Sequence, residues 1–185
     1  QMGIGTRQTL ESDSPLRHDL FLPAPFAALE SVTVNGEAVE PETVDGLLRP
    51  YVRVSVPDAT RTTVRVVGTG QLPKLIYPRR FGTGRETEGL TGWRYGGPLS
   101  GNELVIECEG GRILELHNPQ SLFSTIRFYP HKLQAIVKDI RGHHTLFVQV
   151  ETGVGTYWAP VDIQCVPRLE ITQARLAALL APGED

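Results

Sequence analysis

Apolar and polar residues alternate with a period of two over most of this chain. The pattern is clear at 51–57 (YVRVSVP) and 62–68 (TTVRVVG), where valines alternate with arginine, serine and threonine. Successive side chains of a strand point to opposite faces of its sheet, so these runs predict half-buried strands with one face in water. Asn35-Gly36, after the alternating run SVTV, predicts a two-residue type I′ hairpin turn.

The same alternation returns in the second half of the chain. It occurs in NELVIEC, GRILEL, STIRFYP, KLQAIVKD, TLFVQVE and GTYWAPVDIQC. Short strands separated by short turn sequences are typical of a β-sandwich. The sequence therefore predicts an all-β fold made of two β-sandwich, immunoglobulin-like modules, one at 1–70 and the other at 101–168.

Two further segments complete the predicted organisation. Residues 71–100 are rich in Gly, Pro, Arg and aromatic residues without a sustained period, and we expect a connecting segment there. Residues 169–185 contain TQARLAALLAP, which predicts one short C-terminal helix. The first module shows few strands for a closed sandwich, so we expect strands of the second module or sequence upstream of Gln1 to complete it.

Composition and charge narrow the classes of partner. The chain has 185 residues and is 40% hydrophobic, which is enough to bury a core. Its net charge of −3 provides no basic field that would attract nucleic acid, and we expect no nucleic-acid partner. Since the sequence holds no run of eighteen apolar residues, we expect no membrane-spanning helix.

His143 and His144 stand directly before the alternating run TLFVQV. Neighbouring strand residues point to opposite faces, so both rings reach one metal ion only if the backbone turns there, and Gly142 permits a turn. His131 and Asp139 are the nearest further ligands in sequence. We favour corner residues whose ring nitrogens bond backbone groups, and the sequence predicts neither a metal nor a cofactor. A metal-binding module is the alternative.

The two cysteines fall in phase with apolar residues of predicted strands. Cys108 follows Leu104 and Ile106, and Cys165 follows Val161 and Ile163. Free cysteine is among the most buried residue types, so we expect two buried thiols in a core. A disulfide between them is the alternative, and it would favour an oxidising compartment.

Paired carboxylates are the candidates for acid–base chemistry. Glu86 and Glu88, and likewise Glu107 and Glu109, are two residues apart and would share one face of a strand. Such pairs are common on solvated strand faces, and the sequence contains no short catalytic motif. We therefore predict a protein without catalytic residues. The alternative is a small hydrolase or lyase of sugars, with its site in the 77–101 loop and Glu86 or Glu88 as acid or base.

Arginine and aromatic residues gather in the glycine-rich segment 77–101. We select five of them as candidate ligand-binding residues: Arg79, Arg80, Trp93, Arg94 and Tyr95. Aromatic faces beside guanidinium donors suit sugar rings, and they also suit a carboxylate or a partner protein. The interpretation that we favour for the segment is that its aromatic rings pack between the two modules and its arginines pair with acidic neighbours, because an ordered loop of this length must pack on its own large side chains.

Two sequence features carry a resemblance to a known group of domains: HNPQSLF at 117–123 and GHHTLFVQVETGVGTYWAPVDIQCVPRLEI at 142–171. Together they resemble the β-rich accessory domains of unassigned function that accompany six-hairpin, glucoamylase-like glycosidase domains in large bacterial proteins. The resemblance implies a non-catalytic accessory sandwich of a carbohydrate-active protein, periplasmic or extracellular. Its partners would be the other domains of that protein and a glycan. The resemblance transfers no catalytic residue to this chain.

Overall fold

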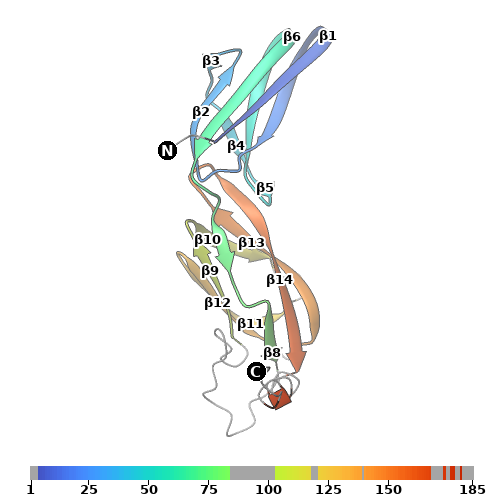
Figure 1. Ribbon diagram of the computed structural model, residues 1–185, viewed down its shortest axis with the longest axis vertical. Coiled ribbons are helices and arrows are strands. Elements are labelled where there is room, and N and C mark those ends of the chain that lie inside the picture. The colour runs from blue at the N-terminus through green and yellow to red at the C-terminus, as the bar shows by residue number, and fades with distance from the viewer. Residues whose placement is uncertain are drawn as a thin grey trace, which may run out of the picture. The chain divides into compact units, whose positions relative to one another are not determined.

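The computed structural model is all β, which confirms the predicted fold class. It describes residues 4–83, 103–117, 121–138 and 140–167, together with 173, 176, 177 and 180. The chain divides into two compact units (Figure 1). The first unit comprises 1–74, 109–115 and 149–159, and the second comprises the described parts of 75–108, 116–148 and 160–185.

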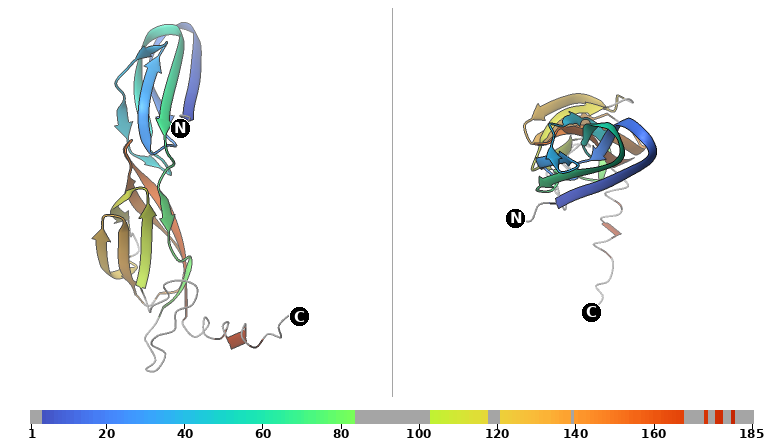
Figure 2. Two further views of the ribbon diagram at one scale, coloured as in Figure 1. Left: turned by 60° about the vertical axis from the view of Figure 1, so that its left-hand side comes forward. Right: turned by 90° about the horizontal axis from the view of Figure 1, so that it is seen from above.

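The first unit is built on the first six strands. These are β1 (Ile4–Pro23), β2 (Ala28–Val34), β3 (Glu37–Ala38), β4 (Glu42–Val44), β5 (Gly46–Leu47) and β6 (Tyr51–Thr69). β1 and β6 pair antiparallel from Ile4 opposite Gly68 to Pro23 opposite Tyr51. The register shifts on both sides of Leu16. Here the two-stranded ribbon turns over, as Figures 1 and 2 show.

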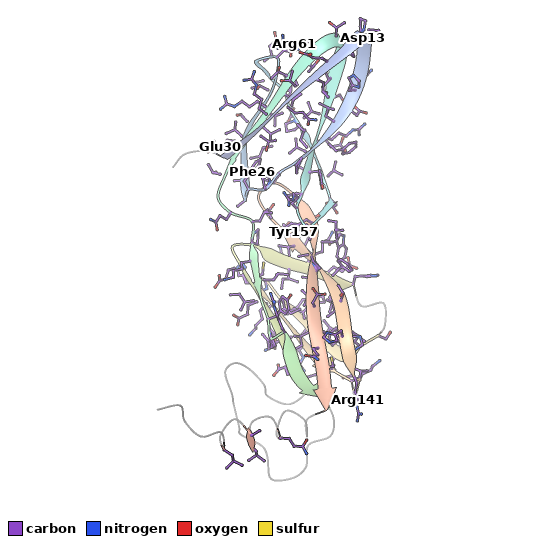
Figure 3. The ribbon with its side chains drawn as sticks, turned by 45° about the vertical axis from the view of Figure 1, so that its right-hand side comes forward. Asp13, Phe26, Glu30, Arg61, Arg141 and Tyr157 are labelled. Atoms are coloured by element: carbon purple, nitrogen blue, oxygen red, sulfur yellow. The ribbon has the colours of Figure 1, made fainter. Side chains whose placement is uncertain are left out.

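Because the β1–β6 ribbon turns over, these two strands contribute to both layers of the first unit. One half of β6 pairs with β2, which continues to β3, and the other half pairs with β4. Between the layers lies a core of buried side chains: Leu22, Ala24, Phe26, Val32, Val34, Val52, Val54, Val56, Val64, Val66 and Val154. Figure 3 labels Phe26, which is fully buried in this core. The unit thus extends beyond the 1–70 module predicted from the sequence, because 109–115 and 149–159 also belong to it.

The predicted type I′ turn is confirmed at Asn35-Gly36. Both residues have positive φ angles, 52° and 92°, as this turn requires. The Asn35 amide N–H donates to the Thr63 carbonyl oxygen, and the Thr63 N–H donates to the Asn35 Oδ1, both at 2.8 Å. The side chain of Asn35 thereby ties the turn to the neighbouring strand.

Eight further strands follow along the chain. These are β7 (Lys74–Ile76), β8 (Arg80–Thr83), β9 (Glu103–Glu109), β10 (Arg112–His117), β11 (Phe123–Tyr129), β12 (Lys132–Val137), β13 (Gly142–Glu151) and β14 (Thr156–Pro167). One sheet has the order β11-β12-β9-β7. The other has the order β10-β13-β14-β5, and β8 pairs with β14 in parallel.

β7 and β8 lie inside the segment 71–100, for which the sequence predicts a connecting segment without a sustained period. Both are short, and each pairs with one strand, β7 with β9 and β8 with β14. A strand of three or four residues shows no usable periodicity, so the alternating pattern did not reveal them. The first part of the connecting segment therefore contributes to both sheets of the second unit.

The core of the second unit follows the alternation read from the sequence. Besides Leu116, Leu122 and Phe123, its buried side chains come from alternate positions on β9, β12, β13 and β14: Leu104, Ile106, Cys108, Leu133, Ala135, Val137, Leu146, Val148, Val161, Ile163 and Cys165. Their strand neighbours are half-buried or exposed. The predicted phases of these strands are confirmed, because one face of each packs inward and the other faces water.

Most of the predicted C-terminal helix lies outside the described residues. Gln173, Leu176, Ala177 and Leu180 are helical and exposed, and the helix as a whole stays a prediction. No helical segment in the described part of the chain is long and apolar enough to cross a membrane.

Candidate functional site

The predicted ligand loop falls largely outside the described residues. Trp93, Arg94 and Tyr95 lie in the segment 84–102, and the side chain of Arg80 is not described either. Arg79 is exposed, and its carbonyl oxygen accepts a hydrogen bond from the Gln164 N–H at 2.7 Å. The loop therefore stays a prediction.

The candidate acid–base pairs separate into a described and an undescribed pair. Glu86 and Glu88 lie in the undescribed segment 84–102, so the predicted role of either residue as acid or base stays a prediction. Glu107 and Glu109 are exposed on β9 and alternate with buried residues. The solvated strand face expected for this second pair is confirmed.

The histidine pair occupies a corner, as expected. Gly142 has a φ of 106°, so the backbone turns immediately before the two histidines. His143 is exposed, and the Nε2 atom of the half-buried His144 lies 3.1 Å from the Arg141 carbonyl oxygen. A ring nitrogen bonded to a backbone group is the arrangement that we favoured for this pair.

The candidate metal ligands do not form a site within the described residues. Those residues contain no group of three or more His, Cys, Asp or Glu side chains that could hold a metal ion. His131 is exposed, and its carbonyl oxygen accepts the Cys108 N–H at 2.8 Å. Asp139, the remaining candidate, lies outside the described residues.

Both cysteines are buried thiols, as the alternation predicted. Burial raises the pKa of the Cys165 thiol to about 11, because an apolar surrounding disfavours the thiolate. The thiolate is the nucleophilic form of cysteine, so a raised pKa makes this side chain unreactive near neutral pH. Cys165 therefore contributes to the core, as its position on β14 suggests.

The first unit holds a cluster of polar and aromatic side chains on the outward face of β1, β4 and β6. We call it the Arg53 cluster, and its members are Asp19, Phe21, Glu42, Arg53 and Ser55. The Arg53 Nη2 donates to the Asp19 Oδ2 at 2.9 Å, and the Nη1 donates to the Glu42 Oε2 at 3.0 Å. The Ser55 hydroxyl donates to the Asp19 Oδ1 at 2.6 Å.

Strand register explains why these side chains meet. Phe21 and Glu42 both stand opposite Arg53, and Asp19 stands opposite Ser55. Directly opposed residues of an antiparallel pair lie within side-chain contact distance. The intervening residues of β1 and β6 point inward and fill the core, so the cluster is fixed to a packed scaffold.

The charges of the cluster stabilise one another. Hydrogen bonds from Ser55 and then from Arg53 lower the pKa of Asp19, and the hydrogen bond to Asp19 raises the pKa of Arg53. Both groups therefore stay ionised over the ordinary pH range. A carboxylate with a lowered pKa is a poor proton donor and a weak base near neutral pH. The cluster is better suited to binding than to acid–base catalysis.

Phe21 gives the cluster an exposed aromatic surface. Its side chain is 55% exposed, and the Arg53 guanidinium carbon lies 6.0 Å from the ring centroid. Pro23 and Tyr51, which stand opposite each other on the same outward face, extend this surface and are half-buried. A ring held beside a cation, with oriented carboxylates next to it, offers stacking and hydrogen bonding together.

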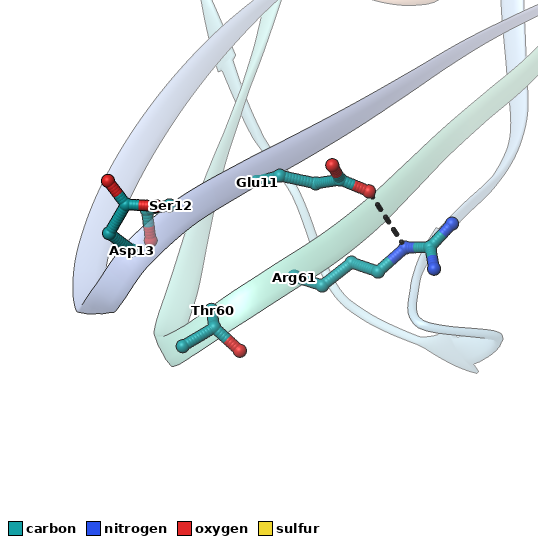
Figure 4. A pocket seen from close by; sticks show the side chains of 5 residues that line it. All are labelled: Glu11, Ser12, Asp13, Thr60 and Arg61. Atoms are coloured by element: carbon teal, nitrogen blue, oxygen red, sulfur yellow. Dashed lines mark ion pairs between the residues drawn. The ribbon is translucent and has the colours of Figure 1, made fainter.

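A second polar feature lies where the β1–β6 ribbon turns over (Figure 4). A depression of about 380 Å³ is lined by Glu11, Ser12, Asp13, Thr60 and Arg61. The Arg61 Nε lies 3.3 Å from the Glu11 Oε1, and both side chains are largely exposed. Exposed ion pairs contribute little stability and fix side chains weakly. In the Arg53 cluster, Arg53 and Asp19 are less exposed, at 38% and 41%, and Asp19 also accepts a hydrogen bond from Ser55, so we regard this cluster as the better-ordered candidate.

Sequence reasoning missed the Arg53 cluster, because its residues come from three strands far apart in the chain. The outward positions of Arg53 and Ser55 follow from the alternation in YVRVSVP, but the partners depend on register, which alternation does not supply. Comparisons with known proteins add no further indication. No family model, curated protein or solved structure matches this chain.

Proposed function

We propose that this chain is a non-catalytic accessory module of a larger bacterial carbohydrate-active protein, exported from the cytoplasm, which packs against other domains and binds a glycan. The observation that carries the glycan role is the Arg53 cluster. Its exposed aromatic ring lies beside a guanidinium that two carboxylates hold in place. The resemblance of 117–123 and 142–171 to glycosidase-associated domains supports the same proposal.

The chemistry of sugars matches that of the cluster. A sugar ring presents C–H groups on its faces, which stack on aromatic side chains, and hydroxyls on its edges, which bond to charged groups. Phe21 supplies the aromatic face, while the carboxylates of Asp19 and Glu42 retain further lone pairs that can accept from hydroxyls. Because Arg53 and Ser55 already orient the Asp19 carboxylate, little freedom of that side chain is lost on binding.

A glycan array tests this site directly. We expect the parent chain to bind at least one glycan, and Phe21→Ala to weaken that binding by about tenfold or more, since a stacking aromatic surface is lost. Phe128→Ala is the matched control, because Phe128 is an aromatic residue of the second unit with a similar exposure of 47%.

The same array shows whether the glycan binds to the Arg53 cluster or to the predicted ligand loop at 77–101. Trp93→Ala should reduce binding only if the 77–101 segment also contacts the glycan. Binding that is unchanged by Phe21→Ala would contradict the Arg53 cluster as the site. Equal losses in Phe21→Ala and Phe128→Ala would do the same, because they would indicate a general effect of losing an exposed ring.

A further inference from the structure

The turn between β13 and β14 is a compact tip built around Thr152. The Thr152 N–H and hydroxyl both donate to the Gly155 carbonyl oxygen at 2.9 Å. The hydroxyl oxygen also accepts the N–H groups of Val154 and Gly155, at 3.1 and 3.2 Å. These bonds satisfy the backbone of the turn locally, which leaves the apolar side chain of Val154 available for packing.

Val154 packs into the core of the first unit. Its side chain is 3% exposed, and it belongs to the same buried cluster as Phe26 and Val52. The neighbouring glycine lies against the first unit's backbone, since a Cβ added to Gly153 would stand 2.9 Å from the Ala27 carbonyl oxygen. A side chain at this position would force the two backbones apart.

Polar contacts surround this apolar contact. The Asp45 carboxylate accepts hydrogen bonds from the Thr156 hydroxyl and from the Gln149 side-chain amide, the latter at 3.3 Å. β5 pairs in parallel with β14, and the Leu48 N–H donates to the Trp158 carbonyl oxygen at 2.8 Å. The hairpin therefore adds strand pairing to the first unit in addition to its buried valine.

Leu48 and Tyr157 extend the contact on both sides. Leu48 has a φ of 71°, in the left-handed region that leucine rarely adopts, and the bond from its N–H helps to hold that conformation. Tyr157, labelled in Figure 3, is 3% exposed, and its hydroxyl donates to the Pro73 carbonyl oxygen at 3.2 Å. Buried tyrosine hydroxyls usually find such a partner.

We propose that the strands β1–β6 of the first unit carry an acceptor site for a β-hairpin tip, which residues 149–159 of the same chain fill, and that these strands are not stably folded without this tip. The acceptor consists of the valine-rich core that contains Phe26 and Val52, the Asp45 carboxylate and the strand β5. A segment that is 75 residues away from the end of the contiguous first unit thus completes its core.

Hydrogen exchange on the full chain tests this proposal, because it reports the opening of each unit separately. We expect Val154→Ala to raise amide exchange in β2 and β6 by about tenfold or more, through the lost burial and the cavity left behind. Exchange in β9 and β12 should stay unchanged. Val148→Ala is the matched control, since Val148 is fully buried on β13 within the second unit and should raise exchange in β9 and β12 instead.

Three outcomes of this experiment would overturn the proposal. They are unchanged exchange in β2 and β6 of Val154→Ala, a rise confined to β9 and β12, and an equal rise in both units. If Val154→Ala fails to fold, Thr156→Val gives a milder test, because it removes only the hydroxyl that donates to Asp45. Faster exchange in β2 and β6 of that variant supports the proposal, and its absence overturns it.

Discussion

Arg53 orders the outward face of three strands through one guanidinium group. It pairs with Asp19 on β1 and with Glu42 on β4, and it lies beside the ring of Phe21. Because each partner is partly exposed, water screens the ion pairs, and their contribution to stability is small. The larger consequence is geometric, since hydrogen bonds from Arg53 and from Ser55 together orient the Asp19 carboxylate.

The pH dependence of the change in Tm caused by Asp19→Asn tests the role of the Asp19 carboxylate in the Arg53 cluster. The folded-state pKa of Asp19 lies below its ordinary value of 3.8, so the ionised carboxylate stabilises the fold above that pH. The stabilisation is lost as the pH falls through the lowered folded-state pKa. We expect Asp19→Asn to lower the Tm by at most a few degrees near neutral pH, and the difference from the parent to vanish in strong acid.

Thermal unfolding followed by circular dichroism at several pH values measures that difference. Asp58→Asn is the control, because Asp58 is an exposed carboxylate on the same strand as Arg53. A Tm difference for Asp19→Asn that stays constant or grows on acidification would contradict the assigned role of Asp19.

Wherever a strand is long enough to show alternation, the sequence predicts which of its residues point into the core and which point to solvent. The buried positions of Cys108 and Cys165 and the outward position of Glu107 follow directly from that local rule. The partners of Arg53 could not be predicted from that rule, because they depend on which strands pair and in which register. Alternation fixes a face, whereas pairing is a property of the whole sheet.

At the scale of elements, the β1–β6 ribbon is the largest departure from the sequence-based prediction. The runs 51–57 and 62–68 were expected to be two strands, and they are two halves of β6. Pro57 and the polar residues after it interrupt the alternation, but pairing with β1 continues beyond them. The first half of β1 is mostly polar, and its sequence therefore lacks the alternation of a half-buried strand. Among the described residues it is an edge strand, which pairs with β6 alone.

Gly68 tests how closely β6 packs in this ribbon. A Cβ at Gly68 would lie 2.1 Å from the Phe26 ring and 2.5 Å from the Ala28 carbonyl oxygen. We expect Gly68→Ala to destabilise the chain by about 1–3 kcal/mol through overpacking of the core. Urea unfolding of the parent and the variant measures this change.

Gly5→Ala is the matched control for Gly68→Ala. Gly5 lies on the paired strand β1, and its added Cβ would make ordinary contacts, at 3.4 Å from the Val66 carbonyl oxygen and at 3.7 Å from the Val67 side chain. We expect little change in stability for this variant. Equal effects of the two substitutions would show that close packing at Gly68 is not the cause.

At the scale of the whole molecule, the two units are not simply successive segments of the chain. The shortage of strands in the first half indicated a contribution from the second module or from sequence upstream of Gln1, but the sequence could not identify the contributing segment. TGVG between two predicted strands has the composition of a turn, and nothing in its local pattern indicates that Val154 is buried in a core formed by residues 22–66. Contacts over such a separation depend on tertiary packing alone.

The proposed function is also tested on the whole molecule, because binding and cleavage of a glycan must both be measured on the full chain of 185 residues. The most direct measurement combines the glycan array with analysis of the bound glycan after prolonged incubation. We predict that the parent chain retains at least one glycan and releases no cleavage product from it. Failure to retain any glycan would contradict the binding role, and release of a shortened sugar would contradict the non-catalytic role and favour a hydrolase or lyase.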